Sequence, residues 1–391
     1  MPENALDSIV IDRFRGLRKL TLDGLGPINI LVGANNSGKT SVLEAISILC
    51  NPYHPSEWIA MVRRRDFGGL DETRVQSLRW CFPQTGDLAD PELLFQSQCE
   101  MSCTGRFPLR KLVAEYTDIV REPSSQDMHR PRRSGERDII EIEEQWRGAE
   151  ITHHVEAEPE RVQSTLFDSG AGSASDPIVM QYWEDSPRIG RPLRSGEGNL
   201  PTETLTPYSY QLNRLQVRSH SQQLFATKNG LAKGRHLVLE LIREFDPEIV
   251  DIGVASLRGK GAAVYVDHAR LGPAPLSIFG DALRRAVLLA NTLHNLKGGV
   301  LLIDEVETGI HVSALERVFS WLANAARRFD VQVFATTHSL EAVDAIAQSV
   351  TERIEDVVTF HLDQTEDETR VKRIAGHLLF RLRHERGLDV R

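Results

Sequence analysis

The chain has 391 residues, 41% hydrophobic and 26% charged, and its 46 Lys and Arg against 55 Asp and Glu give a net charge of −9. This composition is typical of a soluble globular protein large enough for two or three domains, and the acidic balance argues against nucleic-acid binding over the whole surface. Without a membrane-length apolar run, a signal-peptide pattern or cysteines at metal-site spacing, we expect a cytoplasmic protein with free thiols and no membrane partner.

The first hundred residues alternate between strand and helix patterns. Residues 8–14 and 17–25 alternate apolar and polar side chains, which predicts the two strands of a hairpin. Residues 28–33 form a short apolar run typical of a buried strand. Residues 41–49 place their apolar side chains on one helical face, and residues 75–82 are interpreted as a further strand.

The middle of the chain, residues 100–232, has a weaker pattern. Two stretches rich in Pro, Ser, Gly and Arg, at 121–137 and 185–201, interrupt it, and strands are expected at 138–148 and 176–185. We therefore divide the chain into an N-terminal lobe (1–99), an insertion subdomain that is partly irregular (100–232) and a C-terminal lobe (233–391).

The C-terminal lobe returns to regular periodicity. A helix ending at Asp246-Pro247 precedes two paired strands, and strands and helices then alternate up to a final hairpin and helix. The expected helices lie at 281–296, 313–329 and 340–350, and the expected buried strands at 298–307 and 331–339. This alternation predicts an α/β fold with a parallel-rich sheet covered by helices.

A phosphate-binding loop is indicated between the first buried strand and the first helix. Residues 33–40 read GANNSGKT and match the pattern G-x-x-x-x-G-K-[ST] at every fixed position. Glycines let backbone N–H groups surround a phosphate chain at a helix N-terminus, Lys39 would reach the outer phosphates, and the Thr40 hydroxyl would bind Mg²⁺. The residues expected to contact the nucleotide are Gly33, Asn35, Asn36, Ser37, Gly38, Lys39, Thr40 and Ser41.

Further candidate site residues lie at the ends of two predicted buried strands. Asp304 comes directly after four apolar residues, so it is expected at the sheet edge where ligands bind, as a ligand of Mg²⁺. Glu305 comes next and is suited to deprotonate an attacking water. His338 follows the strand at 331–339 and is a candidate contact for an outer phosphate. The alternatives are a solvated acid pair opening a loop and an ordinary loop or capping histidine.

These motifs in this order resemble the ATP-binding cassette (ABC) superfamily, and most of all its RecF/SMC/OLD branch, often classed as AAA-type ATP-binding proteins. The segments that carry the resemblance are residues 11–46 (IDRFRGLRKLTLDGLGPINILVGANNSGKTSVLEAI), 301–311 (LLIDEVETGIH) and 335–339 (ATTHS). The resemblance covers residues 1–85 and 233–391. It implies a P-loop ATPase head with a mixed sheet, a parallel core plus an antiparallel N-terminal lobe, and a large inserted subdomain.

The resemblance also implies roles for individual residues. Lys39 and Thr40 become the Walker A pair, Asp304 the Mg²⁺ ligand, Glu305 the catalytic glutamate and His338 the switch histidine. The signature segment departs from the family, because in PLSIFGDALRR (275–285) Phe279 precedes Gly280, and Ser277 lies three residues upstream. Gly280 and the following helix start are therefore the expected phosphate contact in trans.

In this superfamily ATP is held between two heads, so the resemblance implies a homodimer or larger homo-oligomer that acts as a nucleotide switch. OLD-type proteins carry a C-terminal Toprim nuclease, for which too few residues follow His338. The leading hypothesis is therefore an ATPase of a bacterial anti-phage defence system that controls a nuclease or toxin in trans.

Two alternatives remain open. One is a RecF-like ATPase for DNA repair or DNA loading, and the other is a nucleotide-bound scaffold that scarcely hydrolyses, against which Glu305 argues. DNA binding would use arginines that are otherwise read as solvated loop residues. These are Arg63, Arg64, Arg65, the arginines of 130–137, Arg188, Arg191 and Arg194.

Overall fold

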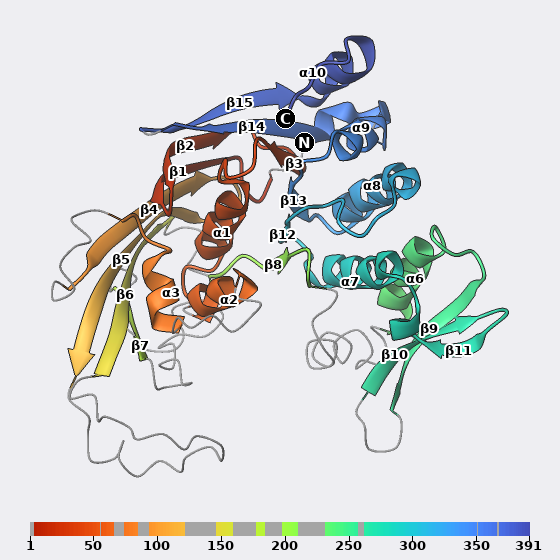
Figure 1. Ribbon diagram of the computed structural model, residues 1–391, viewed down its shortest axis with the longest axis horizontal. Helices are drawn as coiled ribbons and strands as arrows, with labels where there is room; N and C mark the ends of the chain where they lie inside the picture. The colour runs from red at the N-terminus through yellow and green to blue at the C-terminus, as the bar shows by residue number, and fades with distance from the viewer. Residues whose placement is uncertain are drawn as a thin grey trace.

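The computed structural model describes most of the N- and C-terminal lobes and parts of the middle of the chain (Figure 1). The described residues are 4–54, 56–65, 74–84, 94–121, 146–158, 177–183, 198–209, 231–256, 262–349, 351–365 and 367–391. Their helices and strands form a mixed α/β fold with three sheets.

The central sheet has six strands in the order β15-β14-β3-β13-β12-β8. All neighbouring pairs are parallel except β14 with β15, which form an antiparallel hairpin. The strands are β3 (Ile28–Val32), β8 (Thr202–Leu205), β12 (Val300–Ile303), β13 (Gln332–Thr336), β14 (Val357–Gln364) and β15 (Thr369–Ala375). This order places the carboxyl ends of β3, β13 and β12 side by side, which is where α/β sheets bind ligands.

Strand β3 shows why this sheet lies at the centre of the molecule. All five of its residues are buried, as expected for a parallel strand covered on both faces. Leu31 belongs to one hydrophobic cluster, whereas Ile30 and Val32 belong to the other. Because side chains alternate across a strand, the two clusters are the two covered faces of one sheet.

One face of the central sheet is covered by α1 (Lys39–Cys50), which lies between it and a second sheet (Figure 1). The second sheet is antiparallel, in the order β2-β1-β4-β5-β6-β7. Its strands are β1 (Ser8–Phe14), β2 (Leu17–Asp23), β4 (Gln96–Thr104), β5 (Leu109–Arg121), β6 (Trp146–Ala157) and β7 (Ile178–Trp183). Helices α2 (Ser56–Arg65) and α3 (Arg74–Arg79) pack beside α1.

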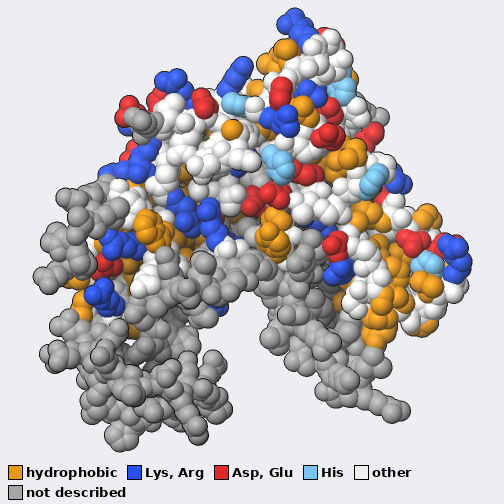
Figure 2. All heavy atoms as spheres, viewed as in Figure 1, with side chains coloured by type: hydrophobic (Ala, Val, Ile, Leu, Met, Phe, Trp, Pro, Cys, Tyr) orange, Lys and Arg blue, Asp and Glu red, His pale blue; other side chains and the backbone are white. Residues whose placement is uncertain are grey.

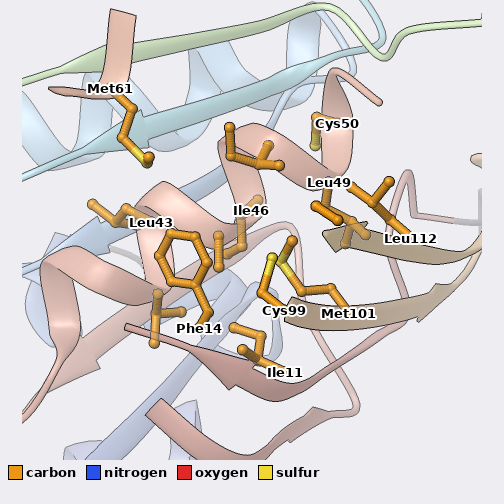
Figure 3. Packing of buried hydrophobic residues seen from close by; sticks show 14 of the residues in the cluster. Ile11, Phe14, Leu43, Ile46, Leu49, Cys50, Met61, Cys99, Met101 and Leu112 are labelled. Atoms are coloured by element: carbon orange, nitrogen blue, oxygen red, sulfur yellow. The ribbon is translucent and has the colours of Figure 1, made fainter. Parts of the chain in front are cut away.

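The core between α1 and the second sheet is apolar and rich in sulfur. Leu43 and Ile46 of α1 face Phe14 of β1, and Cys99 and Met101 lie close to them on β4 (Figure 3). All four cysteines of the chain, Cys50, Cys81, Cys99 and Cys103, are buried and unpaired. Burial raises the pKa of each thiol, to about 12 for Cys81, Cys99 and Cys103.

The other face of the central sheet is covered by α7 (Asp281–Asn295), α8 (Val312–Arg328) and α9 (Leu340–Ser349) (Figure 1). A smaller three-stranded sheet packs next to α7, together with α6 (Leu231–Ile242). Its strands are β9 (Ile249–Ser256), β10 (Ala262–His268) and β11 (Gly272–Pro275), and a 3-10 helix (Leu276–Ile278) leads from it into α7. The chain ends with α10 (Gly376–Phe380) and a π-helical turn (Arg381–Glu385) beside α9.

The structure confirms the predicted mixed sheet with a parallel core and an antiparallel N-terminal lobe. The strand predicted at 75–82 is wrong, because residues 74–79 form helix α3. Val75, Leu78 and Phe82 are all buried, and their spacing of three and four residues is that of a helix face. Of the segment predicted as a strand at 138–148, residues 138–145 lie outside the described residues.

Within the described residues, no helix combines the length and apolar character that crossing a bilayer requires.

A buried histidine joins the second sheet to helix α2 and to the loop that precedes it. His153 of β6 donates its Nδ1 proton to the carbonyl oxygen of Pro52 at 2.8 Å and accepts from Trp58 Nε1 at 2.8 Å. These contacts fix a neutral imidazole, and burial lowers its pKa to about 4. Below about pH 6.5 His153 is protonated in the unfolded chain but stays neutral in the folded chain. The free energy of unfolding therefore decreases as the pH falls toward 4.

We expect His153→Gln to reduce this acid sensitivity. Between pH 7 and pH 4.5, the free energy of unfolding of the variant should fall by about 2 kcal/mol less than that of the wild type. Urea unfolding at the two pH values measures this difference. His154→Gln is the matched control, because His154 is the exposed neighbour on the same strand. Equal losses for wild type and His153→Gln would contradict the prediction.

Candidate active site

The loop between β3 and α1 has the backbone conformation that a phosphate cradle requires. Gly33 and Gly38 have φ angles of 147° and 90°, and Asn36 has a φ of 67°. A Cβ on Gly33 would lie 2.5 Å from the Leu362 carbonyl oxygen, and one on Gly38 would lie 2.6 Å from Leu17 Cδ2. Side chains are therefore excluded at both glycines by conformation and by space.

The polar groups of this loop point to an anionic ligand. Among the described residues, no acceptor binds the backbone N–H groups of Asn35, Asn36 and Gly38. The hydroxyl of Ser37 is buried and also lacks a partner there. Gly38 caps α1 without a side-chain hydrogen bond, so the positive end of the helix dipole faces the loop.

Lys39 extends back over the loop from the first residue of α1. Its ammonium group donates to the carbonyl oxygens of Gly33 at 2.7 Å and Ala34 at 2.8 Å. Burial lowers the pKa of Lys39, and the negative charges of Asp304, Glu305 and Glu307 oppose that shift. The ammonium group therefore binds the loop and interacts electrostatically with three carboxylates.

Asp304, at the end of β12, is bound by two threonines from different elements. Thr40 of α1 donates its hydroxyl to the two carboxylate oxygens at 3.1 and 3.2 Å. Thr336, the last residue of β13, donates to Oδ1 at 2.6 Å. Burial raises the pKa of Asp304, whereas both hydroxyl bonds lower it. The geometry thus joins the predicted Walker A and Walker B residues directly.

Glu305 occupies a constrained position on the same edge. It has a left-handed φ of 49°, and its backbone N–H donates to Thr336 Oγ1 at 2.9 Å. Its carboxylate accepts from Thr308 at 2.9 Å, and its carbonyl oxygen accepts from Arg285 of α7 at 2.8 Å. Strained backbone of this kind is typical of functional sites.

His338 follows β13 on the loop that leads to α9. Its side chain is 57% exposed, and its Nδ1 lies 3.6 Å from a carboxylate oxygen of Glu307. In the space-filling view, basic side chains, acidic side chains and a histidine adjoin one another where α1 meets the ends of β12 and β13 (Figure 2). Most of the predicted site residues therefore converge on one edge of the central sheet.

Gly280 caps α7 in extended conformation. A Cβ at this position would meet no atom within 4 Å, so the start of the helix is open at this point. Helix α7 does reach the site through Arg285, which binds the Glu305 carbonyl oxygen.

The arginines considered for DNA binding have other partners where they are described. Arg65 forms two hydrogen bonds with the buried Glu44 of α1, at 2.7 and 2.9 Å, and Arg64 binds Glu57. Arg15, in the turn between β1 and β2, also pairs with Glu44, at 2.8 Å. Arg188, Arg191, Arg194 and the arginines of 130–137 lie outside the described residues.

Sequence reasoning missed two side chains at this site. Thr336 joins Asp304 and Glu305, and Glu307 contacts the His338 loop. Both lie next to predicted site residues in the sequence, but only the pairing of β12 with β13 brings the two groups together.

Comparisons with known proteins show which families the chain resembles. Residues 116–344 match the family described as AAA domain, putative AbiEii toxin, Type IV TA system, and residues 5–126 match the AAA ATPase domain. An ATP/GTP phosphatase of Helicobacter pylori is 20% identical over 89% of this chain and 89% of its own length. The DNA replication and repair protein RecF of Acinetobacter baylyi is 56% identical over 39 residues, 10% of this chain and 11% of that protein.

Among solved structures, an SMC head bound to the C-terminal winged-helix domain of ScpA is 11% identical to the chain. The match covers 95% of this chain and 98% of that one, with a TM-score of 0.49. The first family match spans more than half of the chain. The chain therefore belongs to the family described as AAA domain, putative AbiEii toxin, Type IV TA system, and it is an AAA-family ATPase.

Proposed function

We propose that this ATPase is a dimerising nucleotide switch that controls an effector protein in trans, as part of an anti-phage defence system. The observation that carries the switch is the hydrogen-bonded group of Thr40, Asp304, Thr336 and Glu305. It joins the first turn of α1 to the ends of β12 and β13, so a nucleotide bound by the phosphate loop acts on both strand ends.

The residues present fit a magnesium ion. Thr40 and Asp304 offer a hydroxyl and a carboxylate, which are the hard oxygen donors that Mg²⁺ prefers. Burial raises the pKa of Asp304, and a divalent ion bound by its carboxylate would stabilise the charged form. When bound, Mg²⁺ would neutralise charge on the phosphate oxygens.

The chain's own residues divide the work of hydrolysis. The loop amides and Lys39 hold the triphosphate, and Glu305 orients the attacking water and accepts its proton. The water oxygen forms a bond to the γ-phosphorus while the bond to the β-phosphate oxygen breaks, which releases ADP and phosphate. His338, which follows β13, donates to the outer phosphate.

Separate observations support the proposed effector protein and the proposed dimer. The family description of a putative toxin in a toxin–antitoxin system supports action together with a second protein. Binding of ATP between two heads is supported by the open space around Gly280, where a Cβ would meet no atom within 4 Å and a partner's nucleotide could approach the start of α7.

The Glu305→Gln variant tests the switch. We expect it to bind ATP, to hydrolyse it about 100-fold more slowly than the wild type, and to become dimeric or larger when ATP is added. Light scattering after size exclusion, with and without ATP and Mg²⁺, measures the size. In cells that carry the complete system, the same variant should lose protection against phage.

Glu316→Gln is the matched control, because Glu316 is an exposed glutamate of α8. It should hydrolyse ATP and protect cells as the wild type does. A Glu305→Gln protein whose size does not respond to ATP would refute dimerisation, and full protection by that variant would refute the defence role.

A further inference from the structure

The side chain of Glu307 has no assigned role in the site described so far. It is only 13% exposed, although it lies two residues beyond Glu305 in a turn. Its negative charge acts on the Lys39 ammonium, so it lies within electrostatic range of the phosphate loop. A largely buried carboxylate next to a site for a triphosphate is electrostatically unfavourable unless a cation accompanies it.

Glu307 makes its contacts with the loop of His338. Its Oε1 accepts the backbone N–H of His338 at 3.3 Å and lies 3.6 Å from Nδ1 of the same residue. Its Oε2 is buried and has no hydrogen-bond partner among the described residues. One carboxylate thus faces both the main chain and the ring of a single histidine.

The loop of His338 is held from its other side by the end of the chain. Arg391 donates to the carbonyl oxygen of His338 at 3.1 Å and is itself paired with Asp389 at 3.0 Å. The ring of His338, with 57% of the side chain exposed, is the part of the loop that stays able to turn. A carboxylate close to one ring nitrogen favours the ring orientation that turns the other nitrogen away from it.

We propose that Glu307 is a positioning residue that holds the His338 ring, through Nδ1, in the orientation that presents Nε2 to the outermost phosphate. This inference rests on the proposed role of His338. The carboxylate restricts the orientation of the ring, as an acid does for the histidine of a catalytic triad. The pairing differs from that of Glu305, whose carboxylate accepts from Thr308 instead.

The test is a double-mutant cycle on kcat with Glu307→Gln, His338→Ala and the double variant. We expect Glu307→Gln to lower kcat about tenfold with KM and the affinity for a fluorescent ATP analogue within about twofold, because only orientation is lost. In the His338→Ala background the same change should have no further effect on kcat, since the two residues act as a unit.

Glu307→Asp is the conservative variant and should recover part of the lost kcat. Glu316→Gln serves again as the matched control and should leave kcat unchanged. If Glu307→Gln lowered kcat by the same factor in the His338→Ala background as in the wild type, the pairing would be wrong. If Glu307→Gln had the wild-type kcat while His338→Ala was inactive, the pairing would also be wrong, but the proposed function would stand. A fully active His338→Ala protein would instead overturn the role of His338, and with it this inference.

Discussion

Replacement of Lys39 by alanine is expected to lower the rate of ATP hydrolysis by about 1,000-fold, or about 4 kcal/mol of transition-state stabilisation. The ammonium group lies above a loop of inward-facing amides, where two carbonyl oxygens now accept its protons. A triphosphate would offer better acceptors, because a hydrogen bond between charged groups is stronger than one to a neutral carbonyl. Charge that develops on the γ-phosphate would gain most from this contact.

ATP binding should weaken as well, by about tenfold to 100-fold, since a charge-assisted hydrogen bond contributes about 1.5 to 3 kcal/mol. Hydrolysis is followed by phosphate release, and binding by titration with a fluorescent ATP analogue. Lys372→Ala is the matched control, because Lys372 is an exposed lysine of the edge strand β15. A Lys39→Ala protein that retained more than a third of the wild-type rate would contradict the assignment of the phosphate loop.

Replacement of Asp304 by asparagine is expected to lower hydrolysis by a similar factor, about 1,000-fold, without destabilising the free protein. The amide keeps one oxygen to accept from Thr40 and Thr336 but removes the negative charge. Because burial raises the pKa of Asp304, its ionised form costs folding free energy at neutral pH, and the neutral amide avoids this cost.

Thermal unfolding separates the two effects. Without nucleotide, Asp304→Asn should unfold at the wild-type temperature or above it, whereas the extra stabilisation that Mg²⁺ gives to the nucleotide-bound wild type should be absent. Asp363→Asn, at an exposed position of β14, is the control for the loss of a carboxylate. The same Mg²⁺-dependent rise in melting temperature in Asp304→Asn and wild type would rule out Asp304 as the ligand.

The phosphate loop and the position of Asp304 could be predicted because short sequence patterns determine both. The glycines at 33 and 38 satisfy backbone requirements that no other residue meets, and the apolar run before Asp304 places that acid at a strand end. The contact between Thr40 and Asp304 joins residues 264 positions apart, yet it follows from the two motifs.

The rest of the site and of the fold depends on contacts between strands that are distant in the sequence, which no short sequence pattern predicts. Thr336 and Glu307 take their roles from the neighbouring ends of β12 and β13. Strand β8 was missed because it has only four residues, TETL, of which three are polar, and it is ordered by parallel pairing with β12. The helix at 74–79 was mistaken for a strand because six residues are too few to separate the two periods.

The burial of every thiol has a practical consequence for following the proposed switch. A thiol reacts as its thiolate, and at neutral pH a group whose pKa has risen to about 12 is almost entirely protonated and shielded from reagents. A single cysteine introduced on the exposed surface would therefore take up a maleimide dye selectively, with the native cysteines left in place. Energy transfer between dyes on two copies of the chain could then report, in real time, the approach and separation of the heads.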